Sequence, residues 1–552
     1  MYPARTDGWK SNWRRVNGVY YTPDDVALAL ATWAIRSDDD RVFDPCYGGC
    51  AFLEAAYEVL LRHGAPNPAS NLWGVDSDPQ AQSHAQGLIS RGASADQFVH
   101  ADFLTIDEAS FPAAPFSVVL ANPPYVRHHY LKSSTIRVGH KAAEYVGIDL
   151  SARASYWAYF VAHLLRFVAP DGRIALVLPG ALLTADYARQ LRRALVQRFR
   201  RLSILLVEDR LFPAAQETTV LVLAEGHGAE QCAVRMGIIS RKSISELTEE
   251  KLERVCRPLP QQWQDDRWIK GVIETDAIEY LEHLVQKSHA VTLGKVASIG
   301  IGTVTGANRY FILRPSQLRH LGIPQTCVKP ILTRASQLPG LVLRECDVER
   351  LLESDAQMLL VTTGGEDVPP ELAAYFAEGE KIGIPHRYKC RSRRPWYVVP
   401  NTSPPDAFLP SLMGYAPRLV VNQAKIECTN TILRVNLREA EEPATILLLA
   451  LASVSTVTQL SAELVGRSYG GGVLKLEPSE AAQLVIPRLS LADVSHLIGG
   501  IHNLNSIGRI QQITHEVDRV ISRAIGISRD EQLAVSESLQ RLRRWRTGKT
   551  SD

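Results

Sequence analysis

The apolar positions in the first 230 residues form two kinds of run, short continuous ones and longer ones at helical spacing. The short runs are typical of strands buried on both faces of a parallel sheet, and they lie at 41–44, 72–76, 98–102, 116–121 and 173–179. The longer runs repeat every three or four residues and predict helices over 23–35, 51–62 and 155–167. Two more apolar runs, at 202–208 and 218–224, predict further strands. The pattern predicts an α/β sheet domain.

The pattern changes after residue 226, where a glycine-bearing break precedes a charged stretch with helical spacing between 240 and 290. From Val291 short apolar runs alternate with turns, and from Val494 to Arg546 the helical spacing returns. The chain therefore divides into a sheet domain (1–228), a helical connection (229–290), a mixed α+β domain (291–490) and C-terminal helices (491–552).

The run 116–121 ends abruptly in Asn122-Pro123-Pro124-Tyr125. Two prolines cannot join a strand ladder, so the strand must stop there with a rigid tip, where open α/β sheets bind ligands. The Asn122 side-chain oxygen and the Pro123 carbonyl could accept both N–H groups of a planar exocyclic amine and draw its lone pair out of conjugation. Tyr125 offers a ring for stacking. The alternative is a simple turn, since Asn-Pro is a common turn dipeptide.

Three successive strands end in acids, which is hard to explain as solvated charge. Asp44 precedes a glycine-bearing turn that lacks the G-x-G-x-x-G of dinucleotide sites, so it suits a cationic or amino-acid-bearing ligand. Asp76 is placed to bind ribose hydroxyls, and Asp102 could accept from an adenine amine while Phe103 packs on the ring. Upstream, Thr22 is expected to cap the first helix, with proline at N1 and two acids in the first turn.

Composition narrows the class of protein further. A hydrophobic content of 45%, a charged content of 22% and a net charge of +2 fit an ordinary globular chain, so any basic surface must be local. The eight cysteines are scattered without a CxxC pair, which indicates reduced thiols and argues against zinc. Without a signal peptide or membrane-length apolar run, a cytoplasmic protein with no membrane partner is expected.

An adjacent histidine pair, His128-His129, lies in the polar stretch 126–147, which is expected to be a mobile loop over the site. The pair could be metal ligands or bases, but adjacent histidines on a loop are more often polar surface. Since amine activation by Asn122 needs neither role, no metal is expected.

The ordered series Tyr-Thr-Pro, Asp-Pro-x-x-Gly, Gly-Val-Asp-x-Asp-Pro, Ala-Asp-Phe and Asn-Pro-Pro-Tyr resembles the motifs of gamma-class N6-adenine DNA methyltransferases of restriction-modification systems. The resemblance implies a class I (Rossmann-like) methyltransferase sheet, closed by 202–208 and 218–224 as an antiparallel pair. It also implies a target-recognition domain after the sheet and S-adenosylmethionine as donor. By motif position Thr22 would hold the methionine moiety, Asp76 the ribose, and Asp102 with Phe103 the adenine. The remaining donor-site residues would be Tyr21, Asp44, Pro45, Gly48 and Asn122. One departure is Cys50, where family members usually carry a second glycine that allows close backbone approach.

The resemblance also implies base flipping, because the amine of a stacked adenine cannot reach Asn122. It places a base-stacking aromatic in the loop around 210–213, and Phe212 is the residue there. Asn122, Pro123, Pro124, Tyr125 and Phe212 would then form the catalytic set. The alternative for Phe212 is a core phenylalanine at a strand edge.

Two segments of the mixed domain suggest contact with DNA. Residues 298–311 resemble a recurrent element of target-recognition domains, and 386–397 interleave basic and aromatic residues without an acid. The expected DNA contacts are Arg387, Lys389, Arg391, Arg393 and Arg394. A solvated basic strand is the alternative. Residues 469–475 and 485–487 also look like recognition-domain strands, and the tail ends in a second basic cluster, 541–546, which could equally be a solvated helix end.

The sequence therefore predicts a site-specific adenine-N6 methyltransferase that acts on double-stranded DNA in a cleft between its domains. The room before Gly18 is too short for a fused nuclease, so modification without cleavage is expected, with any restriction endonuclease partner encoded separately. The alternatives are methylation of RNA adenine, methylation of protein glutamine, and a specificity subunit with an inactive methylase fold. Labelling duplex DNA, RNA and protein with tritiated donor separates them.

Overall fold

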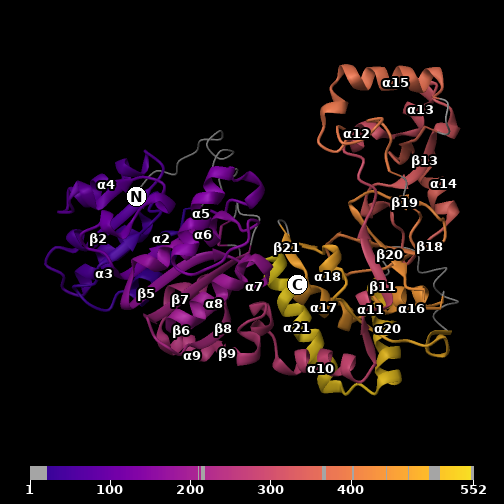
Figure 1. Ribbon diagram of the computed structural model, residues 1–552. Helices are drawn as coiled ribbons and strands as arrows, with labels where there is room; N and C mark the ends of the chain where they lie inside the picture. The colour runs from indigo at the N-terminus through magenta and orange to yellow at the C-terminus, as the bar shows by residue number, and fades with distance from the viewer. Residues whose placement is uncertain are drawn as a thin grey trace. The chain divides into compact units, whose positions relative to one another are not determined.

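The computed structural model describes residues 21–208, 211–212, 218–363, 368–400, 403–439, 441–442, 444–469, 472–495 and 510–548. Arg210, Pro213, Gly18, Gly470 and Gly471, which the sequence patterns include, lie outside these ranges. The chain forms two compact units (Figure 1). The first comprises Met1–Thr275, Ser468–Gly472 and Arg541–Asp552, and the second comprises Asp276–Arg467 and Val473–Gln540.

The first unit is built on a sheet whose order, in the described part of the chain, is β3-β2-β1-β4-β5-β7-β6-β8-β9. The strands are β1 Val42–Asp44, β2 Leu72–Asp76, β3 Phe98–His100, β4 Phe116–Ala121, β5 Val168–Pro179, β6 Phe199–Val207, β7 Thr219–His227, β8 Ala233–Ile239 and β9 Cys256–Pro258. Strands β1 to β5 pair in parallel, and β7 runs antiparallel to β5 and β6. The predicted parallel strands and the antiparallel pair are confirmed. The pair does not close the sheet, however, because β8 adds parallel to β6 and β9 adds antiparallel to β8.

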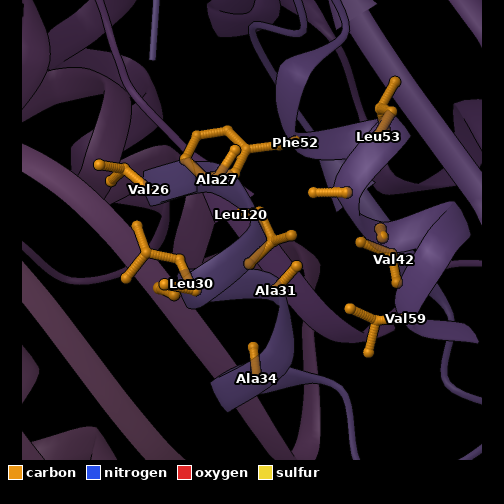
Figure 2. Close-up of a cluster of buried hydrophobic side chains, with 14 of the residues drawn as sticks. Val26, Ala27, Leu30, Ala31, Ala34, Val42, Phe52, Leu53, Val59 and Leu120 are labelled. Carbon is orange, nitrogen blue, oxygen red and sulfur yellow. The ribbon is translucent and has the colours of Figure 1, made fainter. Parts of the chain in front are cut away.

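Helices cover both faces of this sheet. They are α2 Asp24–Ala34, α3 Ala51–Arg62, α4 Ala81–Ile89, α5 Ser133–Tyr145, α6 Tyr156–Leu164, α7 Ala181–Thr184, α8 Arg189–Arg198 and α9 Glu249–Val255. On one face α2 and α3 pack together over β1 and β4, and Figure 2 shows Leu30, Leu53 and Leu120 among the side chains that meet there. Each fully buried leucine of this kind contributes about 1.5–3 kcal/mol. On the other face Phe43 of β1 stacks on Phe116 of β4 at 4.6 Å between ring centroids.

Two predictions need correction, the loop at 126–147 and the helix at 155–167. The stretch 126–147 is not simply a loop, because its second half forms α5, which packs so closely on α6 that a Cβ on Gly139 would lie 2.6 Å from the Tyr159 ring. The helix predicted over 155–167 is shorter and is not amphipathic. All its residues from Trp157 to Leu164 are buried, because α6 lies between the sheet and α5. The predicted bounds of α3, by contrast, are confirmed at both ends.

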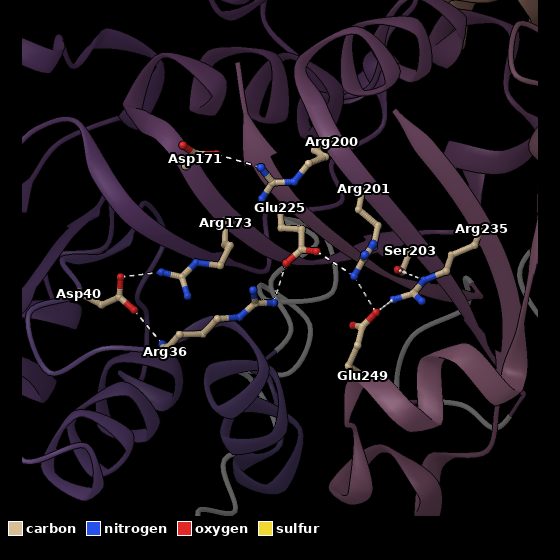
Figure 3. A network of polar contacts seen from close by, with 10 residues as sticks. All are labelled: Arg36, Asp40, Asp171, Arg173, Arg200, Arg201, Ser203, Glu225, Arg235 and Glu249. Atoms are coloured by element: carbon tan, nitrogen blue, oxygen red, sulfur yellow. Dashed lines mark hydrogen bonds and ion pairs between the residues drawn. The ribbon is translucent and has the colours of Figure 1, made fainter. Parts of the chain in front are cut away.

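An ion-pair network ties α2 to the antiparallel half of the sheet (Figure 3). Glu225 of β7 is 6% exposed and lies between Arg36, at 2.6 Å, and Arg201 of β6, at 3.1 Å. Arg201 also pairs with Glu249 of α9 at 2.9 Å, and Glu249 pairs in turn with Arg235 of β8 at 2.6 Å. The network fixes the chain just after α2 to the sheet. The start of the same helix adjoins Thr22, so the position of Thr22 is held as well.

The second unit is a mixed α+β structure. Its sheets, in the described residues, comprise β11-β20-β16-β18-β14, β12-β15-β13-β19, and the pairs β10-β23 and β17-β22. Their bounds are β10 Ala290–Thr292, β11 Ala297–Ile301, β12 Ile312–Leu313, β13 Val328–Leu332, β14 Val342–Leu343, β15 Leu359–Val361, β16 Ala407–Pro410, β17 Leu412–Met413, β18 Val420–Asn422, β19 Glu427–Cys428, β20 Ile432–Leu437, β22 Val473–Lys475 and β23 Val485–Pro487. The main helices are α10 Thr275–Gln286, α12 Asn308–Phe311, α13 Pro315–Leu321, α14 Glu345–Glu353, α15 Pro370–Lys381, α16 Thr445–Ala452, α17 Thr456–Val465 and α20 Ile510–Ile525. They are followed by α21 Arg529–Thr547, whose residues from Arg541 onwards belong to the first unit. The predicted fold class is confirmed.

Among the described residues, no single helix has the length and apolar character needed to cross a membrane, and only the bent pair α16–α17 meets those criteria jointly.

Candidate active site

A cavity of about 550 Å³ opens at the carboxyl ends of β1, β2 and β4. Cavities of this size suit a small organic ligand. It is lined by Tyr21, Thr22, Asp44, Pro45, Cys46, Tyr47, Gly48, Gly49, Ala51, Phe52, Asp76, Ser77, Asp78, Pro79, Gln80, Ala101, Phe103, Asn122, Pro124, Tyr156 and Phe160. Asp44 and Asp76 therefore share one cavity with Asn122 and Pro124, as the ends of parallel strands with a common carboxyl edge should.

Asn122 follows β4 directly, and its amide nitrogen donates to the Thr22 hydroxyl at 3.2 Å. Thr22 was expected to cap α2, and this expectation is wrong. Pro23 is the N-cap residue, the helix begins at Asp24, and no side chain caps it. The two predicted acids, Asp24 and Asp25, do lie in its first turn. The buried Thr22 hydroxyl instead orients the Asn122 amide, because accepting from the nitrogen fixes which way the oxygen points.

Asp76 braces the glycine turn. Its carboxylate accepts from the Gly48 N–H at 2.8 Å and from the Asp78 N–H at 2.7 Å. Gly48 has a φ of +45°, and Cβ atoms added to Gly48 or Gly49 would each lie 3.2 Å from the Tyr21 ring. Glycine is therefore needed at both positions, because it lets the Tyr21 ring pack directly against the backbone of the turn.

Burial sets the charge state of the acids. It raises the pKa of Asp44, which is 1% exposed, to about 8, and the nearby charge of Asp76 acts in the same direction. The Cys46 N–H, which donates to Asp44 at 3.0 Å, opposes the shift. Burial also raises the pKa of Asp76 above its ordinary value. Two acidic groups with raised pKa values in one cavity favour a cationic ligand.

Several lining residues escaped the sequence-based prediction. Tyr156 at the start of α6 donates to the Asp102 carboxylate at 2.8 Å, and Phe160 lies one helical turn further on. The buried Tyr47 hydroxyl has no hydrogen-bond partner in the described part of the chain. The aromatic run at 156–160 was the available signal for the first two, but helical spacing alone does not show which face meets a cavity.

Four predicted site residues do not line the cavity. Asp102 lies behind it, because its Oδ1 accepts from Leu104 N–H and Tyr156 O–H. Pro123 is buried, and Tyr125 is 7% exposed with its hydroxyl donating to the Val177 carbonyl at 3.1 Å. Phe212 is 5% exposed and belongs to the hydrophobic core that includes α2 and α3. The structure therefore favours the core interpretation of Phe212 over the base-stacking one.

Cys50, the departure from the motif, occupies a left-handed position with φ 65° at the start of α3. Its side chain is 1% exposed and packs in the core rather than lining the cavity. The family's glycine is explained by this backbone conformation, which costs a non-glycine residue of the order of 1 kcal/mol. Because the thiol points into the core, it does not block a ligand from approaching the glycine turn.

Two family models match consecutive parts of the chain. The family model described as N-6 DNA Methylase matches residues 9–281, and the model described as Type II methyltransferase M.Eco57I, C-terminal domain, matches residues 265–522. Together they cover both structural units. The chain belongs to the N-6 DNA methylase family. It is a DNA methyltransferase of restriction-modification systems.

Relatives of this methylase extend over most of its length. It is 20% identical to the Type II methyltransferase M.AccI of Acinetobacter calcoaceticus, over 86% of each chain. It is 24% identical to the Type II methyltransferase M.XamI of Xanthomonas campestris pv. amaranthicola, over 86% of this chain and 85% of the relative. Among solved structures, the Type IIL restriction-modification enzyme MmeI in complex with DNA matches with a TM-score of 0.55 at 12% identity, covering 97% of this chain and 76% of that one. This likeness shows a shared fold.

The basic segment of the methylase is an irregular loop after Ile384–His386, not a strand. Arg387, Lys389, Arg391 and Arg394 are exposed, and Tyr388 is 71% exposed between Lys389 and Arg391. Trp396 and Tyr397 pack against Phe376 instead of projecting. Arg393 is only half-exposed, and its guanidinium donates to the carbonyls of Val304 and Thr305. The structure gives Arg393 an intramolecular role in place of the expected phosphate contact.

The second basic cluster is not simply a solvated helix end. Arg546 is 4% exposed and donates to the Gly472 carbonyl, and Trp545 is equally buried. Arg541 pairs with Glu274 at 3.3 Å. Arg541 and Arg546 therefore have contacts within the protein, whereas Arg544 of the same cluster is exposed. Within the described ranges, no group of three or more His, Cys, Asp or Glu side chains is arranged to hold a metal ion.

Proposed function

We propose that the methylase transfers a methyl group from S-adenosylmethionine to the N6 amine of adenine at specific sites in double-stranded DNA. The observation that supports this most is the position of Asn122. Its amide, oriented by Thr22, opens onto the same cavity as the buried Asp44 and the half-buried Asp76. An amide beside a cation-favouring cavity is what methyl transfer to a weakly nucleophilic amine requires.

The residues of the cavity fit the donor. Asp44 and Asp76 would receive its positive charge and its ribose hydroxyls, and the Gly48–Gly49 backbone under Tyr21 leaves room for close approach. Phe103 and Phe160 supply an apolar wall for an aromatic base, and the unpartnered Tyr47 hydroxyl can take a polar group. When bound, the donor supplies an electrophilic methyl group. Tyr21, Thr22, Pro45 and Asn122 complete the proposed donor site. Asp102 would act indirectly, through the hydrogen bond that it accepts from the lining residue Tyr156.

The chain's own residues then act on the amine. The Asn122 side-chain oxygen and the Pro123 carbonyl accept the two N–H groups of adenine, which favours a tetrahedral nitrogen with its lone pair out of the ring plane. This set positions and polarises the amine, so no strong base is needed. We propose that any partner restriction endonuclease is a separate protein.

The test of function is the labelling of candidate substrates with tritiated donor. The expected result is label in unmodified duplex DNA, identified as N6-methyladenine, at a recurring sequence found by sequencing the methylated DNA. Label in RNA or in protein glutamine, and not in duplex DNA, would show that the protein acts on that substrate and not on DNA. Absence of label in all three would indicate an inactive fold.

Asp76→Ala is expected to weaken donor binding by about 1–3 kcal/mol, because it removes an acceptor for the donor and releases the Gly48 N–H. DNA affinity without donor should be unchanged, as measured by titration calorimetry and fluorescence anisotropy. The matched control is Asp107→Ala, since Asp107 also accepts a backbone N–H, that of Ala109, but lies outside the cavity. An equal loss of donor and DNA binding would make Asp76 a purely structural residue.

Donor affinity is expected to rise with pH up to about 8. With the pKa of Asp44 raised to about 8, the carboxyl is mostly protonated at neutral pH and must release a proton when a cation binds. Affinity should therefore change by up to ~10-fold per pH unit below 8 and level off above it. Without ligand, the same shift lowers folding stability as pH rises from 3.8 towards 8, because the unfolded carboxyl ionises first.

The measurement is calorimetry of donor binding from pH 6 to 9 in buffers of different ionisation enthalpy, which counts the protons released. Asp44→Asn should bind more weakly and lose the dependence on pH. A flat profile in the unaltered protein would show that Asp44 is already ionised before the donor binds.

A further inference from the structure

In the second unit, the basic loop 387–394 lies directly against the turn 303–309. The Arg393 guanidinium spans two carbonyls of that turn, donating to Thr305 at 2.8 Å and to Val304 at 2.5 Å. Gly306, with a φ of +83°, allows the contact, because a Cβ there would lie 2.8 Å from the Lys389 Cβ. Buried Cys390 packs against the same turn, with its sulfur 3.9 Å from the Thr305 carbonyl oxygen. Two segments whose contacting residues, Thr305 and Arg393, are 88 positions apart in sequence thus form one element.

The turn itself is fixed to the sheets. Thr303 pairs through its backbone with Cys428 and Asn430, and its hydroxyl donates to Glu427, which is itself paired with Lys329. The fully buried Thr305 hydroxyl accepts from the Ala307 N–H at 3.1 Å and donates to Asn308 at 2.5 Å. A segment with these internal hydrogen bonds presents its exposed side chains in a defined geometry.

A hollow of about 510 Å³ lies where the two segments meet. It is lined by residues 304–309, Arg387 and Asn430, with no acidic side chain among them. Arg309, Arg387 and Asn430 are exposed. Within the described part of the chain, the guanidinium groups of Arg309 and Arg387 make no hydrogen bond or ion pair with protein atoms. Two guanidinium groups and an amide therefore line the hollow with their donors available.

We propose that this hollow is a base-reading subsite for duplex DNA, and that Arg393 is a positioning residue that holds Arg387 and Arg309 on it. The chemistry favours purine edges, because arginine pairs with the O6 and N7 atoms of guanine and asparagine with the N6 and N7 atoms of adenine. The phosphates would be contacted by Lys389, Arg391 and Arg394, which are exposed on the same loop outside the hollow. The inference rests on the proposed DNA substrate but not on methyl transfer.

The experiment is selection of binding sequences from a random duplex pool by the full-length protein without donor. We expect the unaltered protein to enrich a sequence motif, and Arg387→Ala or Arg309→Ala to relax one or two of its positions. Arg393→Ala should relax the position read by Arg387, although it removes no contact with DNA. Arg394→Ala is the matched control. It should keep the motif, weaken all sequences alike and reduce the salt dependence of log K by about 1.

A double variant separates positioning from general damage. If Arg393 acts through Arg387, the Arg387→Ala/Arg393→Ala protein should discriminate no worse than Arg387→Ala alone, with the remaining motif positions intact. Three results would overturn the proposal: an unchanged motif in Arg393→Ala, additive losses in the double variant, or binding by the unaltered protein without any motif. Because binding is read directly, a protein that selects a motif but fails to methylate would refute the proposed reaction and leave this inference standing.

Discussion

Asn122→Ala is expected to lower kcat by about 10²–10³-fold while weakening donor binding far less. The variant removes an acceptor whose bond to the amine strengthens as the nitrogen becomes tetrahedral, so the loss falls on the transition state more than on binding. The Thr22 hydrogen bond makes the effect specific to the oriented amide. Single-turnover rates on duplex DNA, together with donor titration, measure the two quantities separately.

The matched control for this prediction is Asn71→Ala. The Asn71 amide also makes a defined hydrogen bond, to the Asp38 carbonyl at 3.0 Å, but it lies outside the cavity. Its turnover should match that of the unaltered protein. A rate near normal in Asn122→Ala would refute amine activation by this residue, whereas loss of folding in both variants would show that neither substitution reports on catalysis.

Phe212→Ala is expected to act on stability first. Its ring is 5% exposed in the core shared with α2 and α3, and truncating a buried phenylalanine costs about 3–5 kcal/mol. The thermal midpoint of the first unit should fall, and Phe212→Leu, which retains most of the volume, should recover much of it. Calorimetry of the full chain, with and without donor, measures the shift.

A base-stacking role for Phe212 predicts a different result, which the same variants can test. Stacking would leave the midpoint almost unchanged, slow turnover, and respond to a mismatch opposite the target adenine, since a mismatch lowers the cost of flipping. Restoration of the rate by a mismatched duplex, in a protein that melts normally, would contradict the core assignment.

The sequence was most informative where several constraints coincide. Strand β4 was predictable at both ends, because an apolar run meets two prolines that cannot continue a ladder. The acids Asp44 and Asp76 could be placed in one cavity from the chain alone, because parallel strands share a carboxyl edge. In both cases local chemistry and sheet geometry require the same arrangement.

The remaining features depend on tertiary contacts that local pattern does not encode. The polar composition of α5 resembles a loop, and only its packing on Tyr159 through Gly139 shows why a helix forms there. Thr22 has the sequence context of a helix cap, but Asn122, a hundred residues away, takes its hydroxyl. Arg393 has the same sequence environment as Arg394, and only the folded turn at 304–305 separates their roles.

The half-buried position of Cys46 has a consequence for chemical selectivity. Its thiol lines the proposed donor cavity, and burial, with the nearby charges of Asp44 and Asp76, raises the pKa of that thiol well above its ordinary value. Only a thiolate is a strong nucleophile, so a thiol kept protonated is a poor acceptor for a methyl group. In the proposed donor site, the acids that favour a cationic ligand would therefore also keep Cys46 unreactive towards it.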